Sequence, residues 1–268
     1  MSIRPARMRS ARPARITISG LGKRFDGSPV SAVDGVDLDI EPGEFICVVG
    51  ASGCGKSTIL RILAGFEDAT KGKVVVGDEP IIGPSPERGV VFQDYGLFPW
   101  LTVEENVAYG PRQARMSRRD VADTTSWWLA AVGLTRVAKS FPHQLSGGMQ
   151  QRVAIARVLA NQPSLLLMDE PFGALDALTR SSMQAELKRI HREAKVTVVF
   201  ITHSIDEAVY LADRVVIMAG GAAHGHPGHI RRIVEIDLPS DRDVTSTNFN
   251  DYKREIDALV HAGNGVLA

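Results

Sequence analysis

A glycine-rich segment near the start of the chain has the residue types of a phosphate-binding loop. Residues 50–57 read Gly-Ala-Ser-Gly-Cys-Gly-Lys-Ser, which matches the pattern G-x-x-x-x-G-K-[ST]. Glycines let backbone N–H groups turn toward phosphate oxygens, Lys56 can reach the terminal phosphates, and the Ser57 hydroxyl can ligate Mg²⁺. The alternative is a glycine turn without a ligand, which the neighbouring elements disfavour because the loop joins an apolar strand pattern to a helix pattern.

Two acidic residues follow a short apolar run farther along the chain. Asp169 and Glu170 come directly after Leu165–Met168, a candidate buried strand. In open α/β sheets ligands bind at the carboxyl ends of the strands. Asp169 therefore suits Mg²⁺ coordination, and Glu170 could polarise an attacking water. Adjacent acids after a strand are also a common surface feature, so their interpretation depends on the phosphate loop.

Two further polar residues also follow predicted strands. His203 comes after the apolar run 196–201, and Gln93 follows Gly-Val-Val-Phe at 89–92. Parallel strands would bring His203 to the same sheet edge as Glu170, which favours a catalytic role over a solvated histidine. The neutral amide of Gln93 could contact Mg²⁺ or water.

A second candidate anion site lies about ninety residues after the first. Ser146, Gly147 and Gly148 precede a helix whose apolar positions are expected to be buried. Serine is a good N-cap, and bare glycine amides at a helix start attract anions. One γ-phosphate has no obvious need of two such sites in one subunit. We therefore expect this site to serve the nucleotide bound by a second copy of the chain.

The pattern of elements predicts an α/β fold. Alternation predicts half-exposed strands at 16–18 and 36–40, continuous apolar runs predict buried strands at 45–49, 165–168 and 196–201, and helical spacing is seen at 58–64, 117–132 and 178–190. The stretch from about 94 to 161 breaks the strand–helix alternation and is interpreted as a helical insertion. A short helix is expected around 251–262, after the chain turns polar beyond Pro239.

Composition narrows the classes of protein. The 268 residues hold 31 Lys plus Arg and 31 Asp plus Glu, so no charge bias points to nucleic acid. Cys47 and Cys54 are expected to be free thiols in a reducing cytosol. No apolar run approaches the ~18–20 residues of a membrane span, so any membrane role is expected to come through a partner. The arginine-rich, acid-free start is interpreted as a basic disordered tail over residues 1–15, with a targeting peptide as the alternative.

These motifs together resemble the ATPase subunit of an ATP-binding cassette (ABC) transporter, over about residues 16 to 246. The resemblance implies a P-loop NTPase fold with a mostly parallel core sheet, an N-terminal antiparallel β-subdomain and an inserted helical subdomain. It leaves 247–268 as a short C-terminal helix. The matching positions are Gly50, Ala51, Ser52, Gly53, Cys54, Gly55, Lys56, Ser57 and Thr58 for Walker A, Gln93 for the Q-loop, Leu145 to Gln150 for the signature, Leu165 to Glu170 for Walker B, Gly173 to Asp176 for the D-loop, and His203 for the switch histidine.

The resemblance assigns roles to these positions. It implies that ATP is bound by the Walker A residues, by Phe25 stacked on adenine, by Ser146, Gly147, Gly148 and Gln150 of the signature, and by Asp176. Mg²⁺ would be held by Ser57, Gln93 and Asp169, with Glu170, His203 and Gln93 as the catalytic residues. Two subunits would dimerise head to tail around two ATP molecules. Met149 stands where many members have glutamine.

A finer resemblance is to the nitrate/sulfonate/taurine importer group, carried by 86–93, 96–100, 103–107 and 232–239. It implies an ATP-hydrolysing subunit on the cytoplasmic face of the bacterial inner membrane. Its partners would be two membrane-spanning permease subunits and, indirectly, a periplasmic substrate-binding protein, with no nucleic acid. The cluster Tyr95, Leu97, Phe98, Trp100 and Leu101 could receive a permease helix or form a small satellite core. A histidine-rich turn at His224, His226 and His229 departs from the group and could bind a metal or be a solvated loop.

Three other functions stay open at this point. An exporter or lipid-extraction ATPase would share the motifs, but the chain has no fused membrane spans. A soluble ABC ATPase acting on DNA or ribosomes usually carries paired cassettes or long coiled-coil insertions, and this chain has neither. A binding module without hydrolysis is disfavoured because Glu170 and His203 are both present.

Overall fold

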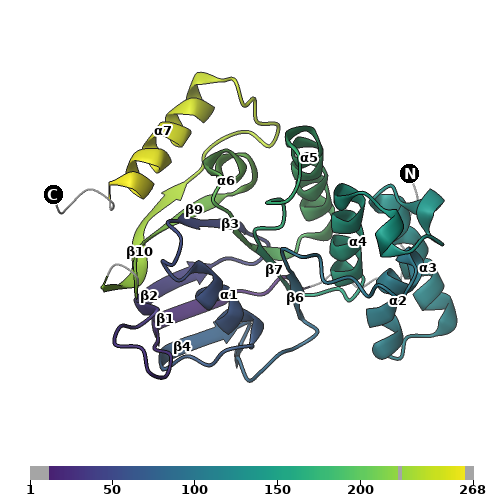
Figure 1. Ribbon diagram of the computed structural model, residues 1–268, viewed down its shortest axis with the longest axis horizontal. Helices are drawn as coiled ribbons and strands as arrows, with labels where there is room; N and C mark the ends of the chain where they lie inside the picture. The colour runs from purple at the N-terminus through teal and green to yellow at the C-terminus, as the bar shows by residue number, and fades with distance from the viewer. Residues whose placement is uncertain (1–11, 223–224, 263–268) are drawn as a thin grey trace. The chain divides into compact units, whose positions relative to one another are not determined.

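The computed structural model describes residues 12–222 and 225–262. Its internal contacts divide it into two compact units. The helical unit consists mainly of Pro86–Leu166 and Pro171–Val196, and the sheet unit of Ala14–Ser85, Leu167–Glu170 and the residues from Thr197 onward. The predicted tail over 1–15 lies almost entirely outside the described residues. Figure 1 labels the helices and strands.

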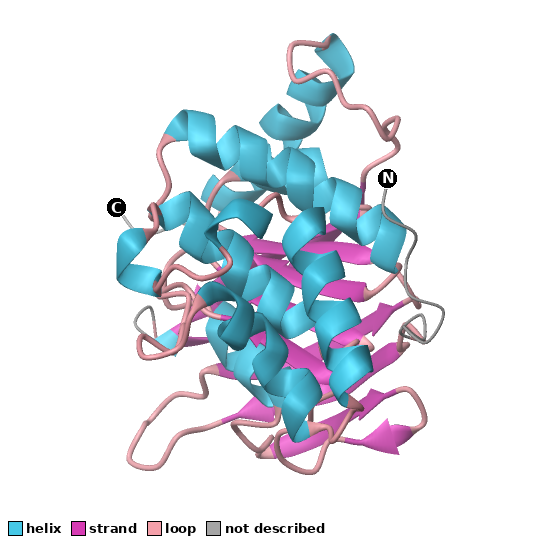
Figure 2. Ribbon diagram, turned by 90° about the vertical axis from the view of Figure 1, so that its right-hand side faces the viewer, coloured by secondary structure: helices cyan, strands magenta, loops and turns pink. Residues whose placement is uncertain are grey.

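The centre of the sheet unit is β3 (Phe45–Gly50), whose first five residues are all buried. It pairs in parallel with β8 (Thr197–Ile201) on one side and β9 (Arg214–Gly221) on the other. Apolar side chains on both faces account for the continuous hydrophobic runs in the sequence, since a strand covered on both sides needs no polar alternation. The strand order is β5-β4-β1-β2-β10-β9-β3-β8-β7-β6, with the strands coloured magenta in Figure 2. The prediction of an α/β fold with a parallel core is confirmed.

The N-terminal strands form the predicted antiparallel region. β1 (Ile16–Lys23) pairs antiparallel with β2 (Val33–Ile40) and with β4 (Lys71–Val76), which continues to the short β5 (Glu79–Pro80). β1 runs five residues past the alternating segment 16–18, because its register shifts after Ile18 and Gly20 adopts φ +57°. Such a bulge breaks the period-two pattern, so alternation alone could not follow the strand through it.

Among the described residues, three helices belong to the sheet unit. They are α1 (Lys56–Ala64), α6 (Ile205–Leu211) and α7 (Thr247–His261). α7 begins four residues before the segment predicted around 251–262, since Ser246 is its N-cap and accepts from the amide of Phe249. It contacts α6 and β9, and Lys253 of α7 forms an ion pair with Asp206 of α6 at 2.5 Å.

The expected histidine-rich turn is corrected by the structure. His226 and His229 lie in β10 (His226–Glu235), which pairs antiparallel with β9 through His226 opposite Gly221 and His229 opposite Ala219. Pairing with β9 makes this segment a strand, although its glycine and proline residues are typical of a turn. His224 lies outside the described residues. Among the described residues there is no group of three or more His, Cys, Asp or Glu able to hold a metal.

The helical unit is built from four longer helices, α2 (Val103–Gln113), α3 (Arg118–Ala131), α4 (Gly147–Leu159) and α5 (Ala177–Ala194), with two short 3-10 turns at Thr135–Val137 and Pro142–Gln144. α2 begins with a capping box in which Thr102 and Glu105 satisfy each other's backbone amides. α3 begins after Ser117 and ends at Ala131, close to Gly133, where the sequence predicts its end. The strand β6 (Arg88–Val91) also belongs here, and β7 (Leu165–Asp169) begins here, where Ser164 and Leu165 donate to the carbonyl of Glu87.

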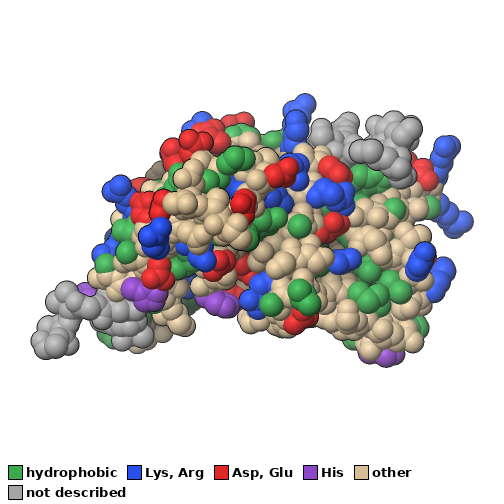
Figure 3. Space-filling model, turned by 90° about the horizontal axis from the view of Figure 1, so that it is seen from above, with side chains coloured by type: hydrophobic (Ala, Val, Ile, Leu, Met, Phe, Trp, Pro, Cys, Tyr) green, Lys and Arg blue, Asp and Glu red, His purple; other side chains and the backbone are tan. Residues whose placement is uncertain are grey.

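On the face shown in Figure 3, basic and acidic side chains are interspersed. Within the described part of the chain, every helix is too short or too polar to span a bilayer.

Candidate nucleotide site

The phosphate loop lies between the carboxyl end of β3 and the first turn of α1. Gly53 and Gly55 have φ +80° and +95°, values that side-chain-bearing residues rarely adopt. A Cβ on Gly55 would lie 2.2 Å from Cγ1 of Val33 and 2.9 Å from the carbonyl oxygen of Ala32. Glycine is therefore required at position 55 by both conformation and space. Loop residues line a cavity, where the amides of a glycine-rich loop can form an anion site.

Lys56 lies within the curve of this loop. Its Nζ donates to the carbonyl oxygens of Gly50 at 2.8 Å and Ala51 at 2.9 Å, and it lies 3.7 Å from Sγ of Cys54. The residue is only 8% exposed, which is rare for lysine and leaves its ammonium group facing the loop. A positive charge held here suits the terminal phosphates of a nucleotide.

Ser57 and Asp169 bring a hydroxyl and a carboxylate together beside the loop. Oγ of Ser57 donates to Oδ1 of Asp169 at 3.3 Å, which joins the start of α1 to the end of β7. Burial of Asp169 raises its pKa above the usual value, whereas the Ser57 hydroxyl and the charge of Lys56 act in the opposite direction. A half-buried carboxylate next to a hydroxyl is a hard oxygen donor pair, and a divalent cation would relieve its desolvation. The residues present therefore fit Mg²⁺.

Glu170 and His203 form a second polar pair at the same sheet edge. Oε2 of Glu170 lies 3.2 Å from Nδ1 of His203, which is within hydrogen-bond distance for the tautomer that carries its proton on Nδ1. Glu170 has φ +45°, a strained left-handed conformation, and its amide donates to the carbonyl of Ile201 at 3.0 Å. The left-handed residue directly after β7 thus carries the carboxylate that contacts the histidine beyond the end of β8.

The phosphate loop, Glu170 and His203 surround one cavity of about 440 Å³ in the sheet unit, and Asp169 adjoins it through its hydrogen bond with Ser57. Its lining joins the phosphate loop, Glu170 and His203, as the sequence predicted, and adds Ala32 and Ala222, which the sequence did not indicate. The glycines of the β9–β10 hairpin were also missed: a Cβ on Gly221 would lie 2.6 Å from the carbonyl of Gly53, and one on Gly228 2.0 Å from that of Cys54. The backbone of the hairpin therefore packs directly against the backbone of the phosphate loop. The pair Gly220-Gly221 after an apolar run is the signal that could have found it.

The signature residues lie in the helical unit, at the start of α4. Ser146 is the N-cap, and its Oγ accepts from the amide of Met149 at 3.4 Å. Gly147 is exposed, whereas Gly148 is buried, and a Cβ at Gly148 would lie 2.4 Å from Cγ2 of Thr179. The side chain of Gln150 donates to the carbonyl of Leu145. This geometry presents an exposed helix N-terminus with glycine amides, which is suited to an anion.

Three other predicted residues have plain local roles. Gln93 is exposed in the loop after β6, in the helical unit. Asp176, in the same unit, is the N-cap of α5 and accepts from the amides of Leu178 and Thr179, and these hydrogen bonds with Thr179 and Leu178 lower its pKa. Phe25 belongs to the sheet unit, is 41% exposed and has Nζ of Lys23 5.0 Å from its ring centroid, but it does not line the cavity.

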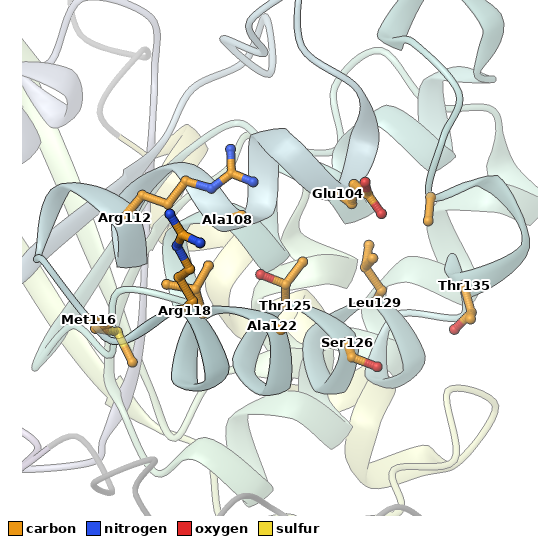
Figure 4. Close-up of a pocket in the computed structure, with 12 residues that line it drawn as sticks. Glu104, Ala108, Arg112, Met116, Arg118, Ala122, Thr125, Ser126, Leu129 and Thr135 are labelled. Carbon is orange, nitrogen blue, oxygen red and sulfur yellow. The ribbon is translucent and has the colours of Figure 1, made fainter.

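A larger groove, of about 690 Å³, lies between α2 and α3 in the helical unit (Figure 4). Its apolar wall includes Ala108, Ala122 and Leu129, and the side chains of Arg112 and Arg118 extend toward each other at one end. The predicted aromatic cluster is partly a satellite core, since the ring centroid of Phe98 lies 4.6 Å from that of Tyr109, while Trp100 remains 70% exposed.

A phosphate loop after a central parallel strand, with acid, amide and histidine groups at strand ends, defines a P-loop nucleotide-binding protein. A sequence profile of the ABC transporter family matches residues 33–173. The chain is 48% identical to an uncharacterized ABC transporter ATP-binding protein of Methanocaldococcus jannaschii, over 87% of this chain and 85% of that one. It is 43% identical to the aliphatic sulfonates import ATP-binding protein SsuB of Bacillus cereus, over 90% of this chain and 94% of the relative.

A solved structure shares the fold. It is a dimeric ATP-binding cassette in a post-hydrolysis state, bound to ADP and Pi, and matches with a TM-score of 0.70 and 31% identity over 84% of this chain and 100% of that one. The chain belongs to the ABC transporter family and is an ATP-binding ATPase of that family.

Proposed function

We propose that the chain is the energy-coupling subunit of a bacterial importer for an aliphatic sulfonate, nitrate, taurine or a related small solute. The observation that carries the proposal is the convergence of the phosphate loop, Glu170 and His203 on one cavity, with Asp169 hydrogen-bonded to Ser57 of its lining. The solute class rests on the likeness to an aliphatic sulfonate import subunit and on the finer motifs at 86–93 and 232–239.

MgATP is the proposed substrate complex. Lys56 and the loop amides would bind the β- and γ-phosphates, Ser57, Asp169 and Gln93 would hold Mg²⁺, and Phe25 would stack on adenine. When bound, Mg²⁺ would neutralise charge on the phosphates. The chain's own contribution is a closely packed cradle, because Gly55 leaves no room for a side chain and Lys56 is buried and hydrogen-bonded to the loop carbonyls.

Glu170 is the proposed general base. Its carboxylate would accept a proton from the attacking water, and the 3.2 Å contact with Nδ1 of His203 would orient the carboxylate. The positive φ of Glu170 supports this role, because strained backbone persists where surrounding structure fixes it and is concentrated at functional sites.

A second copy of the chain is the proposed source of the signature. Ser146, Gly147 and Gly148 at the start of α4 would close over the γ-phosphate held by the partner's loop, with Gln150 and Asp176 beside them. The support is chemical: α4 offers a second anion site in a chain that already has a complete phosphate loop. The dimeric cassette bound to ADP and Pi is the matching precedent.

Two membrane-spanning permease subunits are the proposed partners, and they would hold the ATPase at the cytoplasmic face of the inner membrane. A periplasmic substrate-binding protein would act indirectly. We place the permease contact on the α2–α3 groove rather than on the aromatic cluster alone. A short helix with an apolar face and an acidic residue fits there, because the apolar wall ends at Arg112 and Arg118 (Figure 4).

Charge reversal in the groove tests this contact. The double variant Arg112→Glu/Arg118→Glu should reduce co-purification with the co-expressed permease at least ~10-fold, because like charges would face the acidic helix. ATP hydrolysis by the isolated subunit should stay at the wild-type rate, since neither arginine lines the nucleotide cavity. Arg119→Glu in the same helix is the control, as Arg119 is exposed and pairs with Asp123. Unchanged co-purification of the double variant would remove the groove from the permease contact.

Transport itself is tested in membrane vesicles. The chain and its permease are reconstituted with a periplasmic binding protein loaded with an alkanesulfonate, nitrate or taurine. The proposal expects ATP-dependent accumulation of one of these solutes, which is lost when Glu170 is replaced by Gln. ATP-dependent efflux, or binding of the purified chain to DNA or ribosomes without any transport, would contradict it.

A further inference from the structure

Buried hydrogen bonds among Thr202, Ser204 and Glu207, here called the relay, stabilise the loop that carries His203. Thr202, which follows β8, is 2% exposed, and Glu207 in the first turn of α6 is 5% exposed. Oγ1 of Thr202 donates to Oε2 of Glu207 at 2.6 Å and accepts from the amide of Ser204 at 2.9 Å. A single hydroxyl thus connects the residue before His203, the residue after it and the helix beyond.

The relay is a modified capping box. Ser204 is the N-cap of α6, and its Oγ accepts from the amide of Glu207 at 3.3 Å. In an ordinary capping box the acid at N3 accepts directly from the N-cap amide. Here the hydroxyl of Thr202 lies between the N-cap amide and the carboxylate: it accepts from the amide of Ser204 and donates to Glu207. The backbone on both sides of His203 is fixed as a result.

His203 depends on this backbone for its position. Its side chain is 65% exposed, and the contact that ties it to the site is the 3.2 Å approach to Glu170. Because few side chains surround this exposed imidazole, its position depends mainly on the backbone of residues 202–204. The amide of Thr202 also donates to the carbonyl of Val48 in β3 at 3.3 Å, which ties the same segment to the strand that leads into the phosphate loop.

We propose that Thr202 and Glu207 are positioning residues for hydrolysis, which hold Nδ1 of His203 against the Glu170 carboxylate. This inference rests on the proposed role of His203 and extends it to two buried residues that do not line the nucleotide cavity. Their contribution falls on the chemical step. ATP binding depends on the phosphate loop instead, so substitutions at Thr202 and Glu207 should lower kcat without changing KM.

Thr202→Val is the direct test, because it removes the buried hydroxyl and keeps the shape of the side chain. We expect kcat for ATP to fall on the order of 10- to 100-fold with KM for ATP unchanged. Thr202→Ser restores the hydroxyl and should restore most of kcat. Glu207→Gln keeps an acceptor oxygen without the charge, and should give a smaller loss of kcat in a variant of unchanged volume.

The decisive readout is the dependence on His203. In a His203→Ala background, Thr202→Val and Glu207→Gln should cause no further loss of kcat, because the group they position is already absent. The same fold-loss in both backgrounds, or a Thr202→Val protein with wild-type kcat, would overturn the inference. If His203→Ala itself hydrolyses ATP at the wild-type rate, the proposed role of His203 fails first. A loss with His203→Ala but none with Thr202→Val or Glu207→Gln refutes the relay alone.

Discussion

Replacement of Glu170 by Gln is expected to lower ATP hydrolysis on the order of 10²–10⁴-fold. The amide has the shape of the carboxylate but cannot accept a proton from water at neutral pH. ATP binding should persist, since Lys56 and the loop amides are untouched, and the variant should accumulate as an ATP-bound dimer. Turnover is measured by phosphate release, and dimerisation by size-exclusion chromatography with and without MgATP.

Glu79→Gln provides the matched control for this variant. It makes the same change at an exposed residue of the edge strand β5, away from the cavity lining, and should leave turnover unchanged. A Glu170→Gln protein that hydrolyses ATP at nearly the wild-type rate would take the general-base role from this residue. The role would then have to be assigned to another group that reaches the cavity.

Lys56→Met should abolish useful nucleotide binding. The substitution keeps a long unbranched side chain in the loop but removes an ammonium group that would make charge-assisted hydrogen bonds to phosphate. Each such bond is worth about 1.5–3 kcal/mol, so two of them correspond to a loss of affinity on the order of 10²-fold or more. Binding is measured with a fluorescent ATP analogue by titration.

The Lys56→Met prediction has a control variant and a control for folding. Lys71→Met removes a lysine charge from an exposed position of β4, where Lys71 pairs with Asp34, and should bind nucleotide normally. Lys56 also donates to the carbonyls of Gly50 and Ala51, so the thermal unfolding of both variants is compared without nucleotide. Wild-type affinity in a folded Lys56→Met protein would contradict the proposed phosphate contact.

The parts of the fold that the sequence predicts well are those in which one physical constraint dominates. The buried strand at 45–49 was found because a strand covered on both faces must be apolar throughout, and β3 occupies Phe45–Gly50. The helix after the loop was found because its apolar spacing and Gly65 mark its course and its end, and the structure ends α1 at Ala64 with Gly65 at φ +79°. Each of these signals is local.

Other features depend on contacts between distant residues, which no local pattern reports. The strand β10 was misread as a turn at His226 and His229, because its pairing with β9 outweighs the glycines and proline within it. The strained φ of Glu170 follows from its amide bonding to Ile201, which lies 31 positions later in the chain. The Thr202–Glu207 relay was missed because neither residue type is unusual after a strand or at a helix start.

The central claim is that each hydrolytic site takes its phosphate loop from one protomer and its signature from the other, and a mixing experiment tests it directly. Lys56→Met removes the phosphate contact. Ser146→Asp keeps an N-cap on α4, since aspartate caps as well as serine, but places a negative charge where the γ-phosphate would approach. Each variant alone should be inactive.

A mixed dimer of these two variants contains one site with an intact loop from the Ser146→Asp protomer and an intact signature from the Lys56→Met protomer. Equal mixing should therefore recover hydrolysis, up to about a quarter of the wild-type rate if protomers pair at random. A site built within a single chain cannot be restored by mixing. Two inactive variants that stay inactive together while forming dimers, or a Ser146→Asp protein that is fully active alone, would contradict the account.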